Sequence, residues 1–466
     1  MSGIKRRLEA VSFFDHTGIS EHLERMASKG WMLEKITNLG WIYRQIEPKN
    51  IRFAVSYYPK ASEFDPEPSE SQKIFHEFCA HTGWKLVCTS AQMQIFYNEN
   101  DDPIPIETEP ELELQAIHAS AKKSFIPSYI LLTLVGLMNV ALWVSNLLGD
   151  PIALFSSSSK LFTGVAYLAL MILCIVELIT YFKWYSEAKK VCGQGIFLKT
   201  PNTSKFQKIV LTSILVFAFI WAFDYFVNGD LMKKWVLTLV AIYIPSLFII
   251  VNCVKDTLKK LKASRGMNRT LTFLTSFLVS FGLLGLIIYA TLFASSHGVF
   301  ADKNEETYEH NGMTWIIHQD ELPLVVEDLI DIDFDGYIKQ HSSDSSLFLA
   351  QLDMKQYPRF DAEEYKDIPY LEYTITIVRV PQLYGLCKES ILKSHKEAVV
   401  RNREYRIDEA ELWNANEVYR SFDLDYGFQN QYLLCYGDML VEMYFDWEPT
   451  SDQMKIVSEK LLNNIE

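Results

Sequence analysis

The sequence predicts a multi-domain membrane protein with three parts: a small N-terminal α+β domain over residues 1–120, a five-helix transmembrane bundle over 121–295 and a C-terminal extracytoplasmic α+β domain over 296–466. Three observations lead to this fold class. Five apolar stretches in the middle of the chain are each long enough to cross a bilayer. The loops between them differ sharply in Lys and Arg content. Both flanks show the alternating strands and periodic helices of folded domains.

The N-terminal domain contains a weak internal repeat. The pattern G-W-x-L at 30–33 recurs at 83–86, and in each copy a helical pattern ends at the glycine and a strand led by Trp follows. Glycine at this position supplies the left-handed conformation that closes a helix. We expect the order α-β-β-β-α-β-β, with two related halves on one sheet. The acidic, proline-rich segment KASEFDPEPSES at 60–71 is interpreted as the linker between them.

Four aromatic side chains mark the centre of this domain: Trp31, Trp84, Trp41 and Phe96. One interpretation places them in the core between helix and sheet, where aromatic residues bury a large apolar area. The other makes them the lining of a ligand pocket between the two halves. Replacing Trp31 or Trp84 by Ala distinguishes the two, because truncating a core aromatic costs about 3–5 kcal/mol of stability.

These features resemble a known family. The segments FFD at 13–15, KGWMLEKI at 29–36, TGWKLV at 82–87 and IFYNEN at 95–100 are similar to the uncharacterised bacterial "domain of unknown function 2812" family, over about residues 10–100. The resemblance implies a domain that commonly precedes membrane helices, encoded near transcription regulators of the PadR type. It therefore implies a membrane-linked sensory or regulatory role, and it carries over no catalytic residue.

The five apolar stretches are expected to be transmembrane helices. About 20 residues, each rising 1.5 Å, span a hydrocarbon core about 30 Å thick. Inside lipid a segment must satisfy its own backbone hydrogen bonds, which a helix does. The predicted spans are 125–148, 161–182, 209–227, 235–254 and 271–293.

Polar residues are rare within these spans, and the three of note are Glu177, Asn139 and Asp224. Ionisable groups inside a bilayer are costly and often functional. Glu177 is expected about five residues before the cytoplasmic end of its helix. There it serves either a proton or ion pathway or a structural role near the lipid headgroups. So few polar positions, without broken helices, argue against a transporter that works alone.

Lys and Arg set the predicted orientation. The loop after the second span carries six Lys, the loop after the fourth carries six Lys and Arg, and the loop after the first has Lys160 alone. Positively charged loops stay in the cytoplasm, so the N-terminus is predicted inside and an odd number of crossings places the C-terminus outside. Lys233 and Lys234, after the third span, are a mild exception. The charged N-terminal sequence lacks an apolar core, so no cleavable signal peptide is expected.

The C-terminal domain is predicted to be acidic and rich in strands. From residue 296 onward there are 34 Asp and Glu against 15 Lys and Arg, about −19, whereas the whole chain carries −14. Such a surface repels nucleic acid, so no direct nucleic-acid partner is expected. We expect a strand over 373–380, a helix over 389–401, a hairpin that turns at Gly437-Asp438 and a final helix over 451–464.

One motif in this domain suggests a cation site. Asp331, Asp333 and Asp335 precede a glycine with the spacing that opens an EF-hand-type calcium loop. The twelfth position is Ser342, where a calcium loop needs a bidentate Glu. The motif therefore indicates either a calcium site or a solvated acidic turn, and calcium is the only cofactor that the sequence suggests.

The seven cysteines are spread widely along the chain. Cys387 and Cys435 are expected outside the cytoplasm, where a disulfide is permitted. Their pairing stays open, because a sequence does not show whether two cysteines meet.

No motif for catalysis appears: there is no zinc-ligand spacing, P-loop, dinucleotide fingerprint or nucleophile elbow. We therefore expect a protein that is not an enzyme. The leading hypothesis is a membrane-anchored sensory or regulatory protein that links an envelope signal to a cytoplasmic transcription regulator or signalling protein. The alternative is an accessory subunit of an envelope transport or export system.

Overall fold

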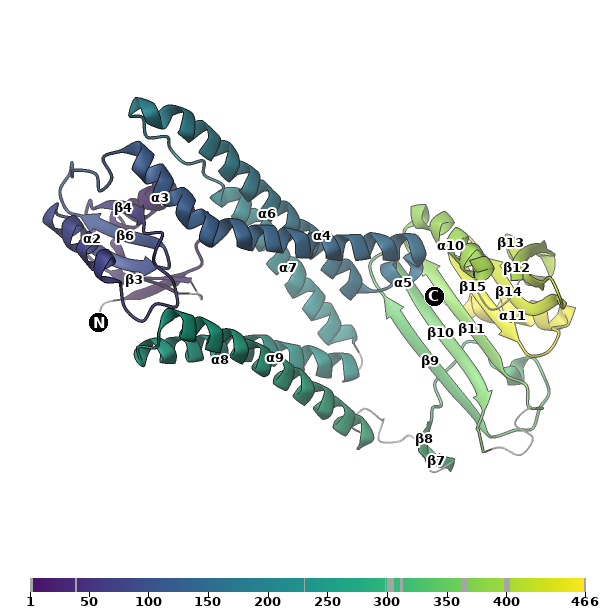
Figure 1. Ribbon diagram of the computed structural model, residues 1–466. Helices are drawn as coiled ribbons and strands as arrows, with labels where there is room; N and C mark the ends of the chain where they lie inside the picture. Colours follow the sequence, from purple (N-terminus) through teal and green to yellow (C-terminus); the bar gives the residue numbers. More distant parts are fainter. Residues whose placement is uncertain are drawn as a thin grey trace. The chain divides into compact units, whose positions relative to one another are not determined.

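The computed structural model describes residues 3–37, 40–229, 231–297, 299, 306–310, 313–361, 367–397 and 403–464. It contains a small N-terminal sheet domain, long apolar helices and a sheet-rich C-terminal region, as the sequence predicts (Figure 1). By its internal contacts the chain forms two compact units. The first joins residues 1–140 to 165–292, and the second joins 141–164 to 293–466.

The N-terminal domain has the predicted element order, preceded by one further strand and followed by one further helix. Gly30 and Gly83 have φ values of +82° and +88°, so glycine ends the first helix of each repeat copy as expected. Asp15 and Ser69 cap the starts of these two helices. The elements are β1 (Ile4–Arg7), α1 (His16–Ala27), β2 (Trp31–Thr37), β3 (Gly40–Gln45), β4 (Arg52–Tyr57), α2 (Glu70–His81), β5 (Lys85–Ser90), β6 (Met93–Asn98) and α3 (Pro110–Lys123).

The prediction of a single sheet is wrong. The strands form two antiparallel three-stranded sheets, β1-β3-β2 and β4-β6-β5. β2 and β5 are neighbours, but each carries a register shift within or directly after its G-W-x-L pattern, between Leu33 and Lys35 and between Leu86 and Cys88. Such an irregularity bends a strand and interrupts regular pairing, so these two edges do not join into one ladder.

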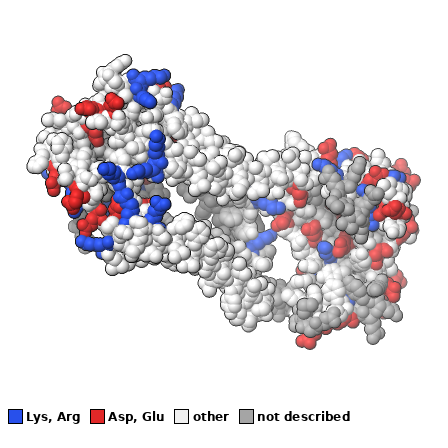
Figure 2. Space-filling view, in the orientation of Figure 1, with Lys and Arg blue, Asp and Glu red and all other residues white. Residues whose placement is uncertain are grey.

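Five helices in the described part of the chain are long and apolar enough to cross a membrane, which indicates a multi-pass membrane protein. Figure 2 shows long stretches of these helices without charged side chains. A short helix, α5 (Pro151–Phe155), lies between the first two. The long helices are α4 (Phe125–Gly149), α6 (Ser158–Val191), α7 (Ser204–Asn228), α8 (Leu231–Lys260) and α9 (Arg265–Ser296).

The helix that carries Glu177 is longer than predicted. The expectation that Glu177 lies about five residues from a helix end is wrong, because α6 continues to Val191. Tyr181, Trp184 and Ala188 are buried in the core of the N-terminal domain. Apolar packing against that domain therefore extends the helix beyond the segment that hydropathy marks.

The second unit contains a seven-stranded antiparallel sheet of order β12-β13-β14-β15-β11-β10-β9. One core cluster includes Trp413, Tyr432 and Val457 of the last helix, and another includes Cys387, Cys435 and Ile152 of α5. The elements are β7 (Glu306–His310), β8 (Met313–Ile317), β9 (Tyr337–Ser345), β10 (Leu349–Pro358), β11 (Leu371–Val378), α10 (Tyr384–Glu397), β12 (Arg403–Asp408), β13 (Glu417–Asp423), β14 (Gly427–Cys435), β15 (Met439–Phe445) and α11 (Ser451–Asn464). The predicted final helix and the hairpin at Gly437-Asp438 are confirmed.

Candidate functional site

The segment that precedes α1 lies against α6 and the start of α4. Phe14 is fully buried, and its ring centroid lies 5.1 Å from that of Tyr181 and 5.7 Å from that of Trp184. Phe125, the first residue of α4, lies 5.7 Å from the Phe14 ring. We call residues 12–17, together with the residues of α6 and of the α6–α7 connection that they contact, the junction. Its aromatic cluster joins the N-terminal domain to two long helices.

A buried polar cluster belongs to the same junction. Ser12 Oγ donates to Glu177 Oε2 at 2.5 Å, and Gln207 Nε2 donates to Ser12 Oγ at 2.8 Å. Thr203 Oγ1 lies 2.6 Å from Ser12 Oγ. Because the single Ser12 hydroxyl hydrogen goes to Glu177, the Thr203 hydroxyl is the donor to Ser12. The donors are thus directed toward the Glu177 carboxylate.

Glu177 itself is fully buried, and its second oxygen, Oε1, has no hydrogen-bond partner among the described residues. A buried oxygen without a hydrogen bond is costly. The bond from Ser12 is therefore the one that stabilises the buried Glu177 side chain among the described residues. The structure therefore gives Glu177 a role in attaching residue 12 to α6. A proton or ion role for Glu177 stays a prediction.

Asp15 extends the polar contacts to the connection between α6 and α7. Its Oδ1 accepts from the amide of Gly18 at 2.9 Å and from Thr200 Oγ1 at 2.5 Å. Thr17 Oγ1 accepts from the Thr200 amide at 3.1 Å. Burial raises the pKa of the Asp15 carboxyl, although the bonds from Thr200 and Gly18 act in the opposite direction. One carboxylate thus caps α1 and also holds the α6–α7 connection.

His16 adds a second titratable group to the junction, beside Asp15. Its Nε2 lies 3.3 Å from Glu113 Oε1 on α3, and its Nδ1 lies 3.3 Å from the carbonyl oxygen of Phe14. Burial lowers the pKa of the imidazole, but the hydrogen bond and charge of Glu113 outweigh it, so the pKa is raised. Both ring nitrogens face acceptors, which suits the protonated ring.

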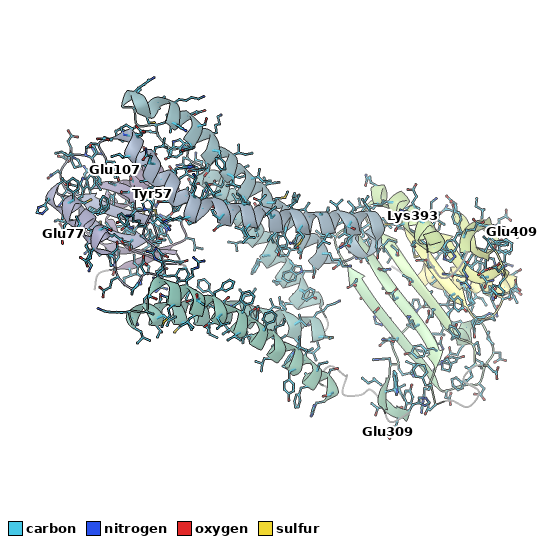
Figure 3. The ribbon with its side chains drawn as sticks, in the orientation of Figure 1. Tyr57, Glu77, Glu107, Glu309, Lys393 and Glu409 are labelled. Carbon is cyan, nitrogen blue, oxygen red and sulfur yellow. The ribbon has the colours of Figure 1, made fainter. Side chains whose placement is uncertain are left out.

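The neighbouring end of β4 reinforces this arrangement. Figure 3 labels Tyr57 and Glu107 at this end of the domain. The Tyr57 hydroxyl donates to the carbonyl of Phe13, and Ser56 Oγ donates to Glu107. Burial raises the pKa of the Glu107 carboxyl. The segment before α1 is therefore held from the domain side as well as from the helix side.

A second attachment of the N-terminal domain is ionic. Arg265 forms a two-pronged pair with Asp65, with Nε–Oδ1 and Nη2–Oδ2 distances of 2.5 and 2.8 Å. Lys255 lies 3.2 Å from Glu63, and Lys262 lies 2.7 Å from Glu67. The acidic segment interpreted as a linker thus lies on the turn between α8 and α9. We call these three pairs the ionic clamp.

The second unit holds the connection between α4 and α6 in a comparable way. Ile152 of α5 is buried in the cluster that contains Cys387 and Leu440 of the C-terminal domain. Ser346 Oγ donates to the carbonyl of Phe155, and Ser158 Oγ donates to the carbonyl of Ser345 at 3.2 Å. The α4–α6 connection is therefore part of the C-terminal domain's core.

The aromatic residues predicted for the N-terminal domain do not gather in one place. Trp84 and Phe96 are buried together with Cys79, and the Trp84 indole donates to the carbonyl of Ile104 at 2.8 Å. Trp41 belongs to the larger core cluster, and Trp31 packs half-buried at its edge. Of the four predicted aromatic residues, Trp41, Trp84 and Phe96 are thus buried and Trp31 is half-buried.

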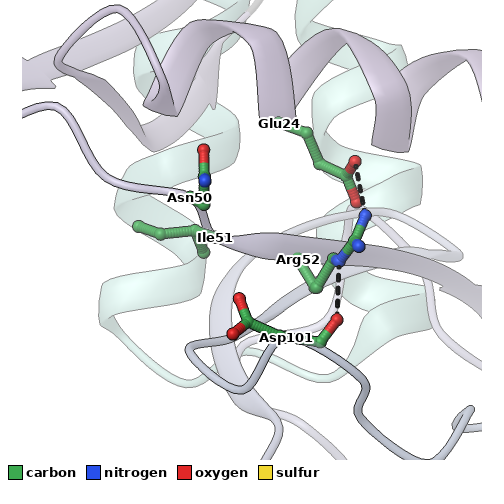
Figure 4. Close-up of a pocket in the computed structure, with 5 residues that line it drawn as sticks. All are labelled: Glu24, Asn50, Ile51, Arg52 and Asp101. Atoms are coloured by element: carbon green, nitrogen blue, oxygen red, sulfur yellow. Dashed lines mark hydrogen bonds and ion pairs between the residues drawn. The ribbon is translucent and has the colours of Figure 1, made fainter.

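A hollow of about 290 Å³ lies elsewhere on this domain, lined by Glu24, Asn50, Ile51, Arg52 and Asp101 (Figure 4). Arg52 lies 3.5 Å from Glu24 and donates to the carbonyl of Asp101 at 3.0 Å. None of the predicted aromatic residues lines this hollow. Glu24 and Arg52 are paired with each other, and the residues that line the hollow add no reactive group.

The other two polar residues predicted to lie within the membrane are apart from the junction. Asn139 Nδ2 donates to the carbonyl of Val135, one turn earlier in α4, at 2.9 Å. Asp224 is half-buried near the C-terminal end of α7. Neither of these two side chains takes part in the hydrogen bonds around Glu177 described above.

The three predicted calcium ligands, Asp331, Asp333 and Asp335, are exposed, whereas Ile332 and Phe334 between them pack against the core. The spacing of the carboxylates is therefore that of an extended segment with alternating sides. In the described residues no three His, Cys, Asp or Glu side chains lie together as a metal site. Calcium binding by this loop stays a prediction.

Cys387 and Cys435 lie in one buried cluster as free thiols. Burial raises the pKa of each thiol to about 11. Thiols react as thiolates, so neither is reactive near neutral pH.

Comparison with known proteins identifies the N-terminal part of the chain. Residues 16–129 match the family described as "Protein of unknown function (DUF2812)". The match confirms the resemblance expected from the repeated G-W-x-L pattern. The match begins at His16 and ends within α4, so it contains α1 and α3, whereas residues 12–15 of the junction and their partners on α6 lie outside it. No curated protein and no solved structure matches the chain.

Proposed function

We propose that this protein is a membrane-anchored sensory or regulatory protein that links an envelope signal to a cytoplasmic partner. The N-terminal domain lies in the cytoplasm and binds that partner, a transcription regulator or another signalling protein. The C-terminal domain lies outside the cytoplasm and meets the signal. The long helices carry the change in conformation between them.

One observation carries the proposal. Helices α4 and α6 each belong to both compact units. At one end Phe125 of α4 and Tyr181 of α6 are buried in the core of the N-terminal domain, and at the other end Ile152 is buried in the core of the C-terminal domain. Packed interiors transmit displacement because they contain few voids. A displacement of α4 and α6 at the end that belongs to the C-terminal domain therefore strains the junction.

The charge distribution supports the proposed orientation. Six cations lie in and around the α6–α7 connection and six in and around the α8–α9 turn, and these two regions contact the N-terminal domain through Lys199–Glu21 and the ionic clamp. The α4–α6 connection and the first turn of α6, whose one cation is Lys160, contact the C-terminal domain. Lys- and Arg-rich loops remain in the cytoplasm.

The coupling is tested by disturbing one unit and observing the other. Ile152→Asp places a charge in the core around α5 of the full-length protein in lipid nanodiscs. We expect faster hydrogen exchange at residues 12–17 and 181–188, in the other unit. Leu347→Asp is the matched control, because Leu347 is 88% exposed in the same unit as Ile152. Exchange in β15 reports whether the C-terminal sheet stays folded.

Unchanged exchange at the junction in the folded Ile152→Asp variant would refute the coupling. The partner is identified separately, by cross-linking to the full-length protein in cells. Capture of a transcription regulator or signalling protein supports regulation. Capture of a permease instead favours the accessory role in transport or export.

A further inference from the structure

The turn between α8 and α9 is a dense basic surface between two apolar helices. Six cations occupy residues 255–269, against the single carboxylate of Asp256. Basic groups at the ends of membrane helices lie at the level of the lipid headgroups and attract anionic lipids. These cations are Lys255, Lys259, Lys260, Lys262, Arg265 and Arg269.

Part of this surface is occupied by carboxylates of the N-terminal domain. The fork of Arg265 holds both oxygens of Asp65 and also donates to the carbonyl of Lys60 at 2.7 Å. Asn268 Nδ2 donates to the carbonyl of Phe64 at 3.2 Å. A guanidinium binds carboxylate and phosphate with the same planar geometry. Asp65 therefore occupies Arg265 in the manner of a phosphate group.

We propose that the α8–α9 turn binds the phosphate groups of anionic phospholipids, and that the acidic segment 63–67 competes with these headgroups for the same cations. The inference rests on the membrane placement of α8 and α9 in the proposed function. It adds the lipid class that acts on the protein and the contact through which this lipid acts.

The ionic clamp suits such a competition because each of its three pairs has a well-exposed member, although Lys255 and Asp65 are only 13% and 17% exposed. The Lys262 and Glu67 side chains are 74% and 49% exposed, and those of Arg265 and Glu63 are 48% and 51% exposed. Exposed ion pairs are weak and sensitive to salt. Headgroups at the high local density of a membrane surface therefore displace these carboxylates.

The clamp also leaves positive charge for a first encounter with lipid. Lys260 and Arg269 are exposed, and among the described residues neither has an ion pair with a carboxylate. The surface is thus attractive to anionic lipid before any carboxylate leaves. Arg269 can be changed without removing a member of the clamp.

The two attachments of the N-terminal domain then respond differently to the membrane. The junction depends on the buried Phe14 and Ser12 and is insensitive to surface charge. The clamp opens as anionic lipid increases, which releases residues 60–67 while residues 12–17 stay in place. The lipid composition thereby determines whether the ionic clamp attaches the N-terminal domain to the α8–α9 turn.

The test measures hydrogen exchange at residues 60–68 of the full-length protein in nanodiscs. We expect protection in phosphatidylcholine alone and faster exchange when phosphatidylglycerol is included. Arg269→Gln keeps the protection in phosphatidylcholine and weakens the response to phosphatidylglycerol about fivefold, the effect of one basic residue at a membrane surface. Lys160→Gln, in the first turn of α6, is the matched control and leaves both unchanged.

Two results would overturn the inference. One is equal exchange at residues 60–68 in the two lipids. The other is opening by inorganic phosphate in phosphatidylcholine at constant ionic strength, which would make the turn a site for free anions. Exchange at residues 12–17 in the Ile152→Asp variant is a separate measurement, so failure here leaves the proposed signalling function standing, and the reverse also holds.

Discussion

The hydroxyl of Ser12 and the carboxylate of Glu177 are 165 residues apart in the chain and meet at 2.5 Å. Both side chains are buried, within 1% exposure. The contact joins the segment before α1 to a helix that is apolar enough to cross a membrane. It converts the residue that looked like an isolated intramembrane charge into an attachment point for the N-terminal domain.

Replacing Ser12 by Ala should weaken the junction. The change removes the only described donor to Glu177 and leaves a buried carboxylate without a hydrogen bond, which costs about 1–3 kcal/mol. The thermal unfolding midpoint of the full-length protein in detergent should therefore fall. Ser28→Ala is the control, since the Ser28 hydroxyl donates to the Arg25 carbonyl at an exposed helix end. Equal midpoints for the two variants would contradict the role of Ser12.

The two repeat tryptophans should differ in their effect on stability. Trp84→Ala removes a buried indole from the cluster with Cys79 and Phe96 and should cost about 3–5 kcal/mol. Trp31 is half-buried at the edge of the other cluster, so Trp31→Ala should cost clearly less. Both losses are measured by chemical denaturation of the full-length protein, with hydrogen exchange in α2 and β6 reporting on Trp84 and exchange in β2 and β3 reporting on Trp31. Equal losses would mean that Trp31 lies deeper in the core than this structure places it.

The stability of the junction should depend on pH through His16. Its pKa is raised in the folded protein by Glu113, so the folded state holds the proton more tightly than the unfolded state does. This contribution is complete below the ordinary histidine pKa of about 6.5 and is lost as pH rises through the raised value. Hydrogen exchange at residues 12–17 should increase over that interval.

His16→Gln should remove this pH dependence, because glutamine keeps a polar side chain but does not titrate. Three carboxylates face the imidazole region, namely Asp15, Glu107 and Glu113. The pKa values of Asp15 and Glu107 are also raised, so their protonation changes the exchange at lower pH. A pH profile near neutrality that is the same in the variant and the parent would exclude His16 as its source.

The orientation can be tested with cysteines placed on exposed positions. Leu347 is 88% exposed in the C-terminal region and Ile74 is 64% exposed on α2. An impermeant thiol reagent should label Leu347→Cys on intact cells above the level of the parent protein, and Ile74→Cys only after lysis. The reverse pattern would invert the topology. The native Cys387 and Cys79 are unsuitable probes, since both are fully buried.

Local patterns in the sequence predicted the elements well. The repeated G-W-x-L pattern located two helix ends, and the glycines there adopt the left-handed conformation that only a residue without a side chain reaches easily. Hydropathy found the five long helices. The final helix over 451–464 and the hairpin at Gly437-Asp438 followed from capping and turn residues. Each of these features is decided by residues that are close together in the chain.

The candidate site could be predicted only in part. Glu177 stood out as a costly charge in an apolar span, but Ser12, Thr203 and Gln207 carry no pattern that relates them to it. The acidic stretch at 60–71 resembled a linker, and only its opposite charge to the α8–α9 turn hinted at the ionic clamp. The division into two three-stranded sheets was also missed, because pairing between distant strands depends on their geometry in the folded chain.

The amino-acid order alone determined that the chain has a repeated N-terminal domain, apolar helices and an acidic, strand-rich C-terminal part. Hydropathy, glycine conformation and capping act over a few residues, so they can be read along the chain. The tertiary structure decided that Phe14 meets Tyr181, that Ser12 meets Glu177 and that Asp65 meets Arg265. These contacts depend on how elements pack across long separations, where many pairings of similar chemistry compete and only the folded geometry selects one.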